Sequence, residues 1–330
     1  MLKFILSLFI IWRVNLEVLA WVGEKVLPVR EGFLGPIPWA NFDGVHYLSI
    51  AKNGYFEFQQ AFFPLYPLLI RALSKVMNGN YVLAGMVISN LSLLGTLVLL
   101  WRLIEKEKLA KWAIIFMLFS PTSFYFGSIY TESLFLLLIL ASFFSLKHKK
   151  WLLYMIFASL ASATRLVGVF LFFPLGLFTY MVYLKKTVGD PLFFIRAQPA
   201  FGAGRSGGKI VFLPRVYFRY FKIFLTVPLT NYDYWIAILE FLTFNWVLFL
   251  LWRGYKKNLP RIWLVFSLLA VIGPTLTGSL SSIPRYVSVA FPIFIVLART
   301  NRKLRYFLFV IFYLLFSILT ILFTSGYFVA

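Results

Sequence analysis

Long apolar segments alternate with short basic segments along most of this chain. Residues 81–101 form a continuous apolar run that ends in the basic segment 102–111. A helix needs about 20 apolar residues to cross a bilayer, so this run predicts a membrane-spanning helix. The same pattern predicts spans at 2–22, 112–126, 129–146, 151–164, 166–184, 213–230, 234–252, 262–280, 287–297 and 306–323. We therefore expect an all-α polytopic membrane protein with about 10–11 transmembrane helices.

Three stretches depart from this pattern. The first twelve residues resemble a signal peptide, but no small-residue cleavage site follows them, so we expect a retained first helix. Residues 23–60 mix acidic residues with several Pro and Gly and predict a long loop. Residues 61–77 are apolar but short, and we expect a helix that lies on the membrane surface or dips into it. Residues 187–231 have the weakest pattern, and 202–209 read as a loop.

The basic segments predict how the chain is oriented. Cytoplasmic loops are enriched in Lys and Arg, so five basic runs are expected in the cytoplasm: 102–111, 147–150, 185–186, 253–261 and 299–305. This assignment is consistent if residues 61–77 do not cross. Four polar segments then face outside: the loop 23–60, the break at 120–133, the turn near Arg165 and the turn 281–286. The unusual polar residues are thus predicted to gather on one side of the membrane.

Composition supports a membrane protein and excludes several other classes. The chain is 61% hydrophobic and 13% charged, which is too apolar to cover a surface in water. Its net charge of +21 is distributed in the short loops between apolar segments, so we expect no nucleic-acid partner. It has no Cys, which excludes disulfides, and two His, which excludes a His-rich metal site. We expect one transmembrane domain over 1–330, with an outer loop and juxtamembrane helices (23–80), a helical module (81–186) and variable C-terminal helices (187–330).

Two acidic residues on the predicted outer side are candidates for chemistry. Asp43 lies in the sequence ANFDGVHYLSIAKNGY, and acidic side chains near lipid are costly and often functional. A solvated loop aspartate or a helix cap is the alternative. Glu132 is the second acid, and it has three open roles: orienting a substrate, binding a metal together with Asp43, or capping a helix. His46 follows Asp43 by three residues and shares its helical face.

Several segments resemble one known family in the same order along the chain. FDGVHYLSIAKNGY, followed by AFFPLYPLLIRAL, resembles the first outer loop of the PIG-V mannosyltransferases. SPTSFYFGSIYTESLF, SATRLVGV, GDPLFFIRAQPAF and PRYVSVAFP resemble later segments of the same family. The similarity spans about residues 40–292. Phe42 departs from the family, which usually has Trp at this position, and the large insertions of eukaryotic members are absent.

This resemblance implies a GT-C fold and a mannosyltransferase activity. Such enzymes transfer a sugar from a polyprenyl or dolichyl phosphate to a hydroxyl, with inversion at the anomeric carbon. The acceptor is expected to be a glycan, glycolipid or protein at the outer face of a bilayer. No cofactor is expected to be required, and a divalent metal is possible but not indicated. Since no retention signal is visible, we expect a prokaryotic plasma membrane with the active site outside.

The resemblance also assigns roles to individual residues. Asp43 is expected to act as the general base, with a pKa raised by partial desolvation. Arg285 and Arg165 are expected to bind the donor phosphate, although snorkelling to lipid headgroups is the alternative for each. Glu132 and His46 complete the expected catalytic group, and His46 has a packing role as its alternative. The expected sugar pocket or interfacial rim is aromatic: Phe42, Tyr47, Tyr55, Tyr66, Tyr130 and Tyr286. Arg196 and Gln198 match a family segment without an assigned role.

Two other functions remain open from the sequence. A lipid-carrier flippase or transporter would be expected to have repeated halves and polar residues at mid-membrane, and neither is visible. A noncatalytic subunit of a glycan-assembly complex would keep the spans without needing Asp43. The absence of a Walker loop and of a D-x-D motif favours a lipid-linked donor. The enzymatic prediction requires that Asp43 and Arg285 meet above one leaflet, around the headgroup of a prenyl carrier.

Overall fold

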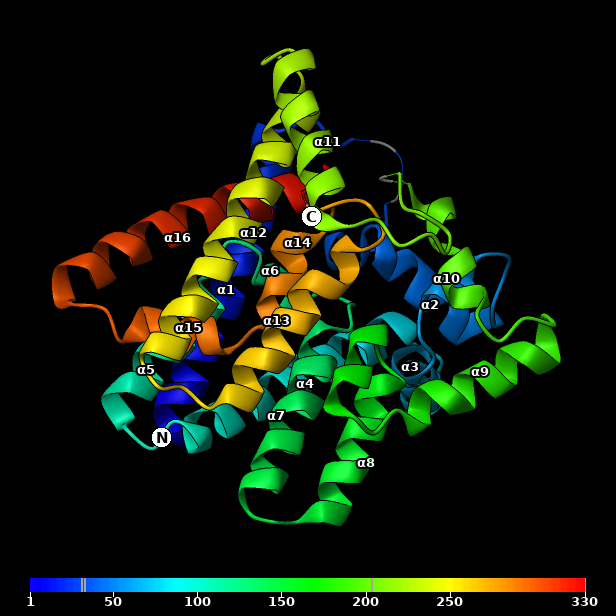
Figure 1. The fold of residues 1–330 in the computed structure, drawn as a ribbon, viewed down its shortest axis with the longest axis horizontal. Coiled ribbons are helices and arrows are strands. Elements are labelled where there is room, and N and C mark those ends of the chain that lie inside the picture. Colours follow the sequence, from blue (N-terminus) through cyan, green and yellow to red (C-terminus); the bar gives the residue numbers. More distant parts are fainter. Residues whose placement is uncertain (31, 33, 203, 330) are drawn as a thin grey trace.

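The structure is a computed structural model that describes residues 1–30, 32, 34–202 and 204–329. Within those residues it contains α-helices, short 3₁₀ helices (η) and loops, and no strand (Figure 1). In chain order the helices are α1 (Leu2–Val26), η1 (Pro38–Ala40), α2 (Asp43–Asn53), η2 (Gln59–Ala61), α3 (Leu65–Val76), α4 (Tyr81–Leu103), α5 (Glu107–Leu118), α6 (Phe124–Gly127), α7 (Glu132–Lys147), α8 (Trp151–Ser162), η3 (Leu166–Leu171), α9 (Leu175–Thr187), α10 (Phe193–Arg196), η4 (Gln198–Phe201), α11 (Leu213–Thr226), α12 (Tyr232–Lys256), α13 (Arg261–Thr275), α14 (Ile283–Tyr286), η5 (Val287–Val289), α15 (Pro292–Ala298) and α16 (Arg302–Thr324).

In the described part of the chain, four helices are long and apolar enough to cross a membrane, namely α1, α4, α12 and α16. Each has 23 or 25 residues, or about 35–38 Å at 1.5 Å per residue, against a hydrocarbon core of about 30 Å. The prediction of an all-α polytopic membrane protein is confirmed. The division of the chain at residues 80 and 186 stays a prediction.

The other expected spans are shorter than the sequence pattern predicted. The run 112–126 is divided into α5, which ends at Leu118, and the four-residue α6, with Pro121 between them. The run 287–297 becomes η5 and the seven-residue α15, which starts at Pro292 and is buried throughout. Proline removes a backbone hydrogen-bond donor and interrupts helices, so an apolar run need not be one span. Among the described residues, fewer helices are long enough to span on their own than the about 10–11 transmembrane helices expected.

The segment 166–184 does not cross the membrane as expected. Phe172 adopts a left-handed conformation and Pro174 follows it, so the segment splits into η3 and α9. Leu184, near the end of α9, packs in one apolar cluster with Phe63 and Phe194. The helix α9 ends beside the loop that follows α2, so Lys185–Lys186 do not lie with the other four basic runs, and their cytoplasmic position stays a prediction. Figure 1 shows α9 extending sideways, away from α7 and α8.

Two further amphipathic helices are too short to span. The helix α3 has 12 residues, which fits the expectation that 61–77 does not cross. The helix α11 has 14 residues and carries Arg215, Arg219 and Lys222, so the expected crossing at 213–230 is wrong. It starts with Pro214 at its second position and stands at the upper edge of Figure 1, beside α12.

Four of the basic loops meet at one end of the molecule. Lys147 Nζ lies 2.8 Å from Glu105 Oε1, which joins the loops 102–111 and 147–150. Lys257 Nζ donates to the Arg299 carbonyl at 3.0 Å, which joins the loops 253–261 and 299–305. Residues from all four loops line a small cavity of about 500 Å³ at this end. The long helices α1, α4, α12 and α16 connect this basic end to the opposite end.

The opposite end is recessed where α7 and α8 reach it. These two neighbouring helices have 16 and 12 residues, or about 24 and 18 Å, against about 35 Å for α4. The Ser89 hydroxyl of α4 donates to the Tyr130 carbonyl at 3.4 Å, and Ser89 is eight residues inside α4. The segment before α7 therefore lies about 12 Å below the start of α4.

Cysteine labelling tests this arrangement, since the chain has no Cys of its own. Lys150→Cys lies at the basic end and Asn231→Cys at the opposite end, and both positions are exposed. A membrane-impermeant maleimide should label them from opposite sides of right-side-out and inverted vesicles. Lys186→Cys should react from the same side as Asn231→Cys, because α9 stays at that end. Labelling of Lys186→Cys together with Lys150→Cys would contradict the structure.

Candidate active site

Asp43 is the first residue of α2 and is held in place by the turn that precedes it. Phe42, just before it, has a φ of 56°, which is strained for a residue with a side chain. Asn41 holds this turn, because its Nδ2 donates to the Phe323 carbonyl at 3.0 Å and its own carbonyl accepts from Tyr130 Oη at 2.8 Å. The Asp43 carboxylate therefore has a defined position at a helix N-terminus, where a negative charge is favourable.

Arg285 meets Asp43 across 242 positions of the chain. It lies in the short helix α14, which begins after Ser282, a residue with a φ of 66°. The Thr122 hydroxyl donates to the Pro284 carbonyl at 2.6 Å and holds α14 against the break before α6. Arg285 Nη1 donates to Asp43 Oδ2 at 2.6 Å. Asp43 and Arg285 were predicted to meet, and they do so at the end of the molecule opposite the basic loops.

Glu132 contacts both Arg165 and Arg285. Its Oε1 accepts a hydrogen bond from Arg165 Nη1 at 2.7 Å and lies 3.1 Å from Arg285 Nε. The Glu132 side chain is 1% exposed, and its Oε2 has no hydrogen-bond partner among the described residues. A buried carboxylate is stable only when it is paired, so the two guanidinium groups stabilise Glu132 at this position. Asp43, Arg285, Glu132 and Arg165 form one chain of alternating charges, which we call the charged cluster.

Tyrosine rings surround the two arginines of the charged cluster. The Arg165 Cζ lies 4.8 Å from the ring centre of Tyr286, and the Arg285 Cζ lies 5.2 Å from the same ring. Arg285 is also 5.4 Å from the ring centre of Tyr130. Ring faces attract cations and exclude water, so they strengthen the electrostatic interactions of both guanidinium groups.

The pKa of Asp43 differs from the sequence-based expectation. Burial raises it, as expected, but the adjacent charge and hydrogen bond of Arg285, together with the charges of Arg205 and His46, outweigh burial and hold the pKa below its ordinary value of 3.8. The same pairing raises the pKa of Arg285 despite its burial. The expectation of a raised pKa for Asp43 is therefore wrong for the protein without a substrate. Both groups carry full charges at neutral pH.

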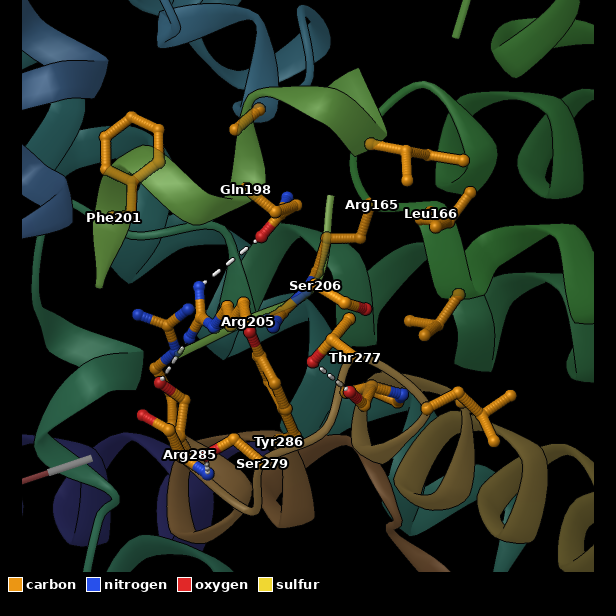
Figure 2. Close-up of a pocket in the computed structure, with 18 of the residues that line it drawn as sticks. Arg165, Leu166, Gln198, Phe201, Arg205, Ser206, Thr277, Ser279, Arg285 and Tyr286 are labelled. Carbon is orange, nitrogen blue, oxygen red and sulfur yellow. Dashed lines mark hydrogen bonds between the residues drawn. The ribbon is translucent and has the colours of Figure 1, made fainter. Parts of the chain in front are cut away.

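A cavity of about 1260 Å³ opens beside the charged cluster. Asp43, Arg165 and Arg285 line it, and Figure 2 shows both arginines near Tyr286. Its remaining wall includes apolar residues of η3 and of the helices α11, α12 and α13. Such a cavity has room for a sugar phosphate and for part of an attached apolar chain.

The other predicted site residues divide between the cavity and the core. Phe42, Tyr47, Tyr130 and Tyr286 line the cavity. Tyr66 does not, because it is fully buried and its hydroxyl bonds with Ser89 Oγ at 2.7 Å.

Two more of the predicted residues lie outside the lining. The Tyr55 hydroxyl donates to the Phe62 carbonyl at 2.8 Å beneath the adjoining loop. His46 stacks on Phe62 with ring centres 4.9 Å apart, and burial lowers its pKa, so it is neutral at pH 7. These contacts favour the packing role for His46.

Glu240 and Arg205 are polar residues of the cavity lining that were not singled out from the sequence. Glu240, in α12, accepts a hydrogen bond from the Tyr220 hydroxyl, which also accepts from the Leu280 backbone N–H at 3.1 Å. An acidic residue inside an apolar run was a usable sequence signal for Glu240. Arg205 lies in the glycine-rich segment 202–209, where no periodicity indicates which way a side chain points. Within the described residues, no group of three or more His, Cys, Asp or Glu is placed to hold a metal ion.

Comparison with known proteins identifies the family. The model of the PIG-V mannosyltransferase family matches residues 29–231, which is more than half of the chain. The chain belongs to the PIG-V mannosyltransferase family. Over 262 residues it is 26% identical to GPI mannosyltransferase 2 of Schizosaccharomyces pombe, and this alignment covers 72% of the chain and 52% of that protein. The chain thus spans about half the length of this curated relative.

The family match covers Asp43, Glu132, Arg165 and Arg205 but ends before Arg285. The charged cluster of this PIG-V family member is therefore built from inside and outside the matched region. No solved structure matches the chain. The GT-C fold consequently remains what the family resemblance implies, while the family prediction itself is confirmed.

Removing the Glu132 carboxylate should destabilise the protein. Glu132→Ala leaves two buried guanidinium groups with one carboxylate, which costs about 3–5 kcal/mol for a buried ion pair. We expect a clearly lower unfolding temperature in detergent, followed by tryptophan fluorescence. Glu105→Ala, at an exposed ion pair with Lys147, is the matched control and should change little. Equal unfolding temperatures for the two variants would show that Glu132 does not hold the arginines.

Proposed function

We propose that this protein transfers a mannosyl group from a polyprenyl- or dolichyl-phosphate donor to a hydroxyl of a glycan, glycolipid or protein acceptor. One observation carries the proposal: Asp43 and Arg285 are in contact at the edge of a large cavity in a member of a mannosyltransferase family. A carboxylate suits the deprotonation of an acceptor, and a guanidinium suits the stabilisation of a leaving phosphate.

The proposed reaction is a single displacement. The acceptor oxygen forms a bond to the anomeric carbon, and the bond from that carbon to the phosphate oxygen breaks on the opposite face. Asp43 takes the acceptor proton, and the electron pair of the broken bond leaves with the polyprenyl phosphate. The leaving phosphate gains one negative charge, which Arg285 and Arg165 stabilise. This displacement inverts the configuration of the anomeric carbon.

Donor binding would raise the low pKa of Asp43. In the resting protein Arg285 stabilises the ionised carboxylate and so makes it a weak base. A bound phosphate offsets the charge of Arg285 and adds a negative charge near Asp43, and both effects raise the pKa of Asp43. In this proposal Asp43 becomes an effective base only when the donor is present, which limits loss of the activated sugar to water.

The position of the site supports transfer at one face of a membrane. The charged cluster lies opposite the basic end, so the positive-inside rule directs it away from the cytoplasm. We extend the proposal to the outer face of a prokaryotic plasma membrane. The location of the cluster at one end, rather than at mid-membrane, favours an enzyme over a transporter.

Replacing the proposed base should abolish most of the transfer. Asp43→Asn keeps the side-chain shape but cannot accept a proton, and general-base catalysis contributes about 10²–10⁴-fold. We expect a rate loss of this size with a polyprenyl-phosphate-mannose donor and membrane-extracted acceptor, followed by mass analysis of the product. Asp190→Asn, at an aspartate that pairs with Arg196, is the control. Transfer by Asp43→Asn at the wild-type rate would exclude the base role.

The pH dependence should reveal the link between Arg285 and Asp43. Because the pKa of Asp43 lies below 3.8 in the resting protein, the carboxylate stays ionised above that pH and is lost only on further acidification. The acidic limb of kcat/KM, which reports the free enzyme, should therefore lie below pH 4. In Arg285→Gln the guanidinium no longer opposes the effect of burial on Asp43, so the pKa of Asp43 rises. The acidic limb should therefore move to higher pH. Identical acidic limbs in both proteins would show that Arg285 does not control Asp43.

A further inference from the structure

Arg205 reaches into the cavity from a glycine-rich loop that is fastened to the segment carrying Arg285. The Ser206 N–H donates to the Thr277 carbonyl at 2.8 Å, and the Val211 N–H donates to the Leu276 carbonyl at 2.9 Å. These bonds tie the loop to the connection between α13 and α14. Figure 2 shows the Arg205 side chain in the cavity, close to Gln198 and to the segment of Ser279 and Arg285. Arg205 is therefore held beside the charged cluster although its loop is rich in glycine.

The charged cluster has no net charge of its own. Arg165 and Arg285 supply two positive charges, and Asp43 and Glu132 supply two negative charges. A neutral group of this kind orients its members but attracts an anion only weakly. The cation that captures a negatively charged substrate must come from outside these four residues.

Arg205 is available for that purpose. Among the described residues no carboxylate forms an ion pair with it, and its contacts are long hydrogen bonds to neutral groups, at 3.4 Å to Gln198 Oε1 and 3.3 Å to Ser282 Oγ. The neighbouring acid Glu240 accepts instead from Tyr220. Arg219 also lines the cavity, and it donates to the carbonyls of Gly204 at 3.4 Å and Gly278 at 3.2 Å, which joins α11 to the loop of Arg205 and to the segment before α14. A negatively charged oxygen would form a shorter and stronger hydrogen bond with Arg205 than either of these neutral partners does.

The surroundings of Tyr286 show where an anion would be stabilised. Burial raises the pKa of its hydroxyl, but the charges of Arg205, Arg285 and Arg165 together outweigh burial and the repulsion by Asp43, so the pKa falls below 10.0. Of these three guanidinium groups, Arg205 has the largest effect. A negative charge beside the Tyr286 hydroxyl is thus favoured by three cations that converge from separate parts of the chain.

We infer that Arg205 captures the phosphodiester of the lipid-linked sugar donor, while Arg285 mainly positions Asp43. This inference rests on the mannosyl transfer proposed above. A sugar phosphodiester carries one negative charge, and Arg205 offers one guanidinium that no carboxylate of the described residues pairs with. When the sugar leaves, the phosphate monoester gains a second charge, which Arg285 and Arg165 are placed to receive. Arg205 thereby acts in substrate binding, and the charged cluster acts in the chemical step.

Binding of farnesyl phosphate to the purified full-length protein tests this role directly. Arg205→Gln should weaken farnesyl phosphate binding by about 10- to 100-fold, as expected for losing a charged hydrogen-bond partner. Arg205→Lys should retain an intermediate affinity, since it keeps the charge but not the paired N–H groups. Farnesol, which lacks the phosphate, should bind wild type and Arg205→Gln equally. Arg215→Gln, exposed on α11 and outside the cavity lining, is the matched control and should bind like wild type.

Sugar-transfer kinetics separate this inference from the proposed function. With a polyprenyl-phosphate-mannose donor, Arg205→Gln should raise the donor KM by a similar factor and lower kcat much less. Unchanged farnesyl phosphate binding in Arg205→Gln, or an equal loss of farnesol binding, would overturn the inference and leave mannosyl transfer standing. Wild-type protein that binds farnesyl phosphate through Arg205 but transfers no mannose would overturn the proposed function alone. Wild-type protein that binds no farnesyl phosphate would overturn both.

Discussion

The contact of Arg285 with two carboxylates is the interaction on which the site is built. It joins α14 to the start of α2 through Asp43 and to the start of α7 through Glu132, segments that are far apart in sequence. Buried charges of this kind are costly unless every partner is present, so the cluster specifies one packing of these three segments. The shape of the cavity follows from it, because Asp43, Arg165 and Arg285 all border the same space.

The same contact sets the chemical state of the resting site. An arginine that lowers the pKa of a carboxylate makes a stable pair and a poor base, so stability and reactivity oppose each other here. A substrate that brings its own negative charge relieves this opposition without any large movement of the backbone. Arg285 lies between Asp43 and Glu132, whereas Arg205 lies nearby without a carboxylate partner among the described residues. This arrangement suits a site whose chemical state changes when a substrate binds.

The sequence predicted the family of this protein better than the lengths of its helices. The apolar pattern identified α1, α4, α12 and α16, since a long uninterrupted run allows little else in lipid. It failed at 166–184 and 287–297, where Pro174 and Pro292 divide the apolar runs. The helix α15, in the second run, is buried by protein rather than by lipid. The family motifs brought Asp43, Glu132, Arg165 and Arg285 together, but motif order carries no information about pairing. Arg205 was not predicted because a glycine-rich loop has no periodic pattern that indicates where a side chain points. Tyr66 was assigned to the pocket because a sequence does not distinguish a buried aromatic ring from one that lines a cavity.

The shortness of α7 and α8 has a consequence for the membrane itself. A helix of about 18 Å, with Trp151, Leu152 and Ile156 exposed along its side, meets a bilayer whose apolar layer is about 30 Å thick. Acyl chains next to it must compress or tilt to keep these surfaces covered, at a modest cost for each ångström of mismatch. The protein would thus carry a ring of thinned lipid on this flank.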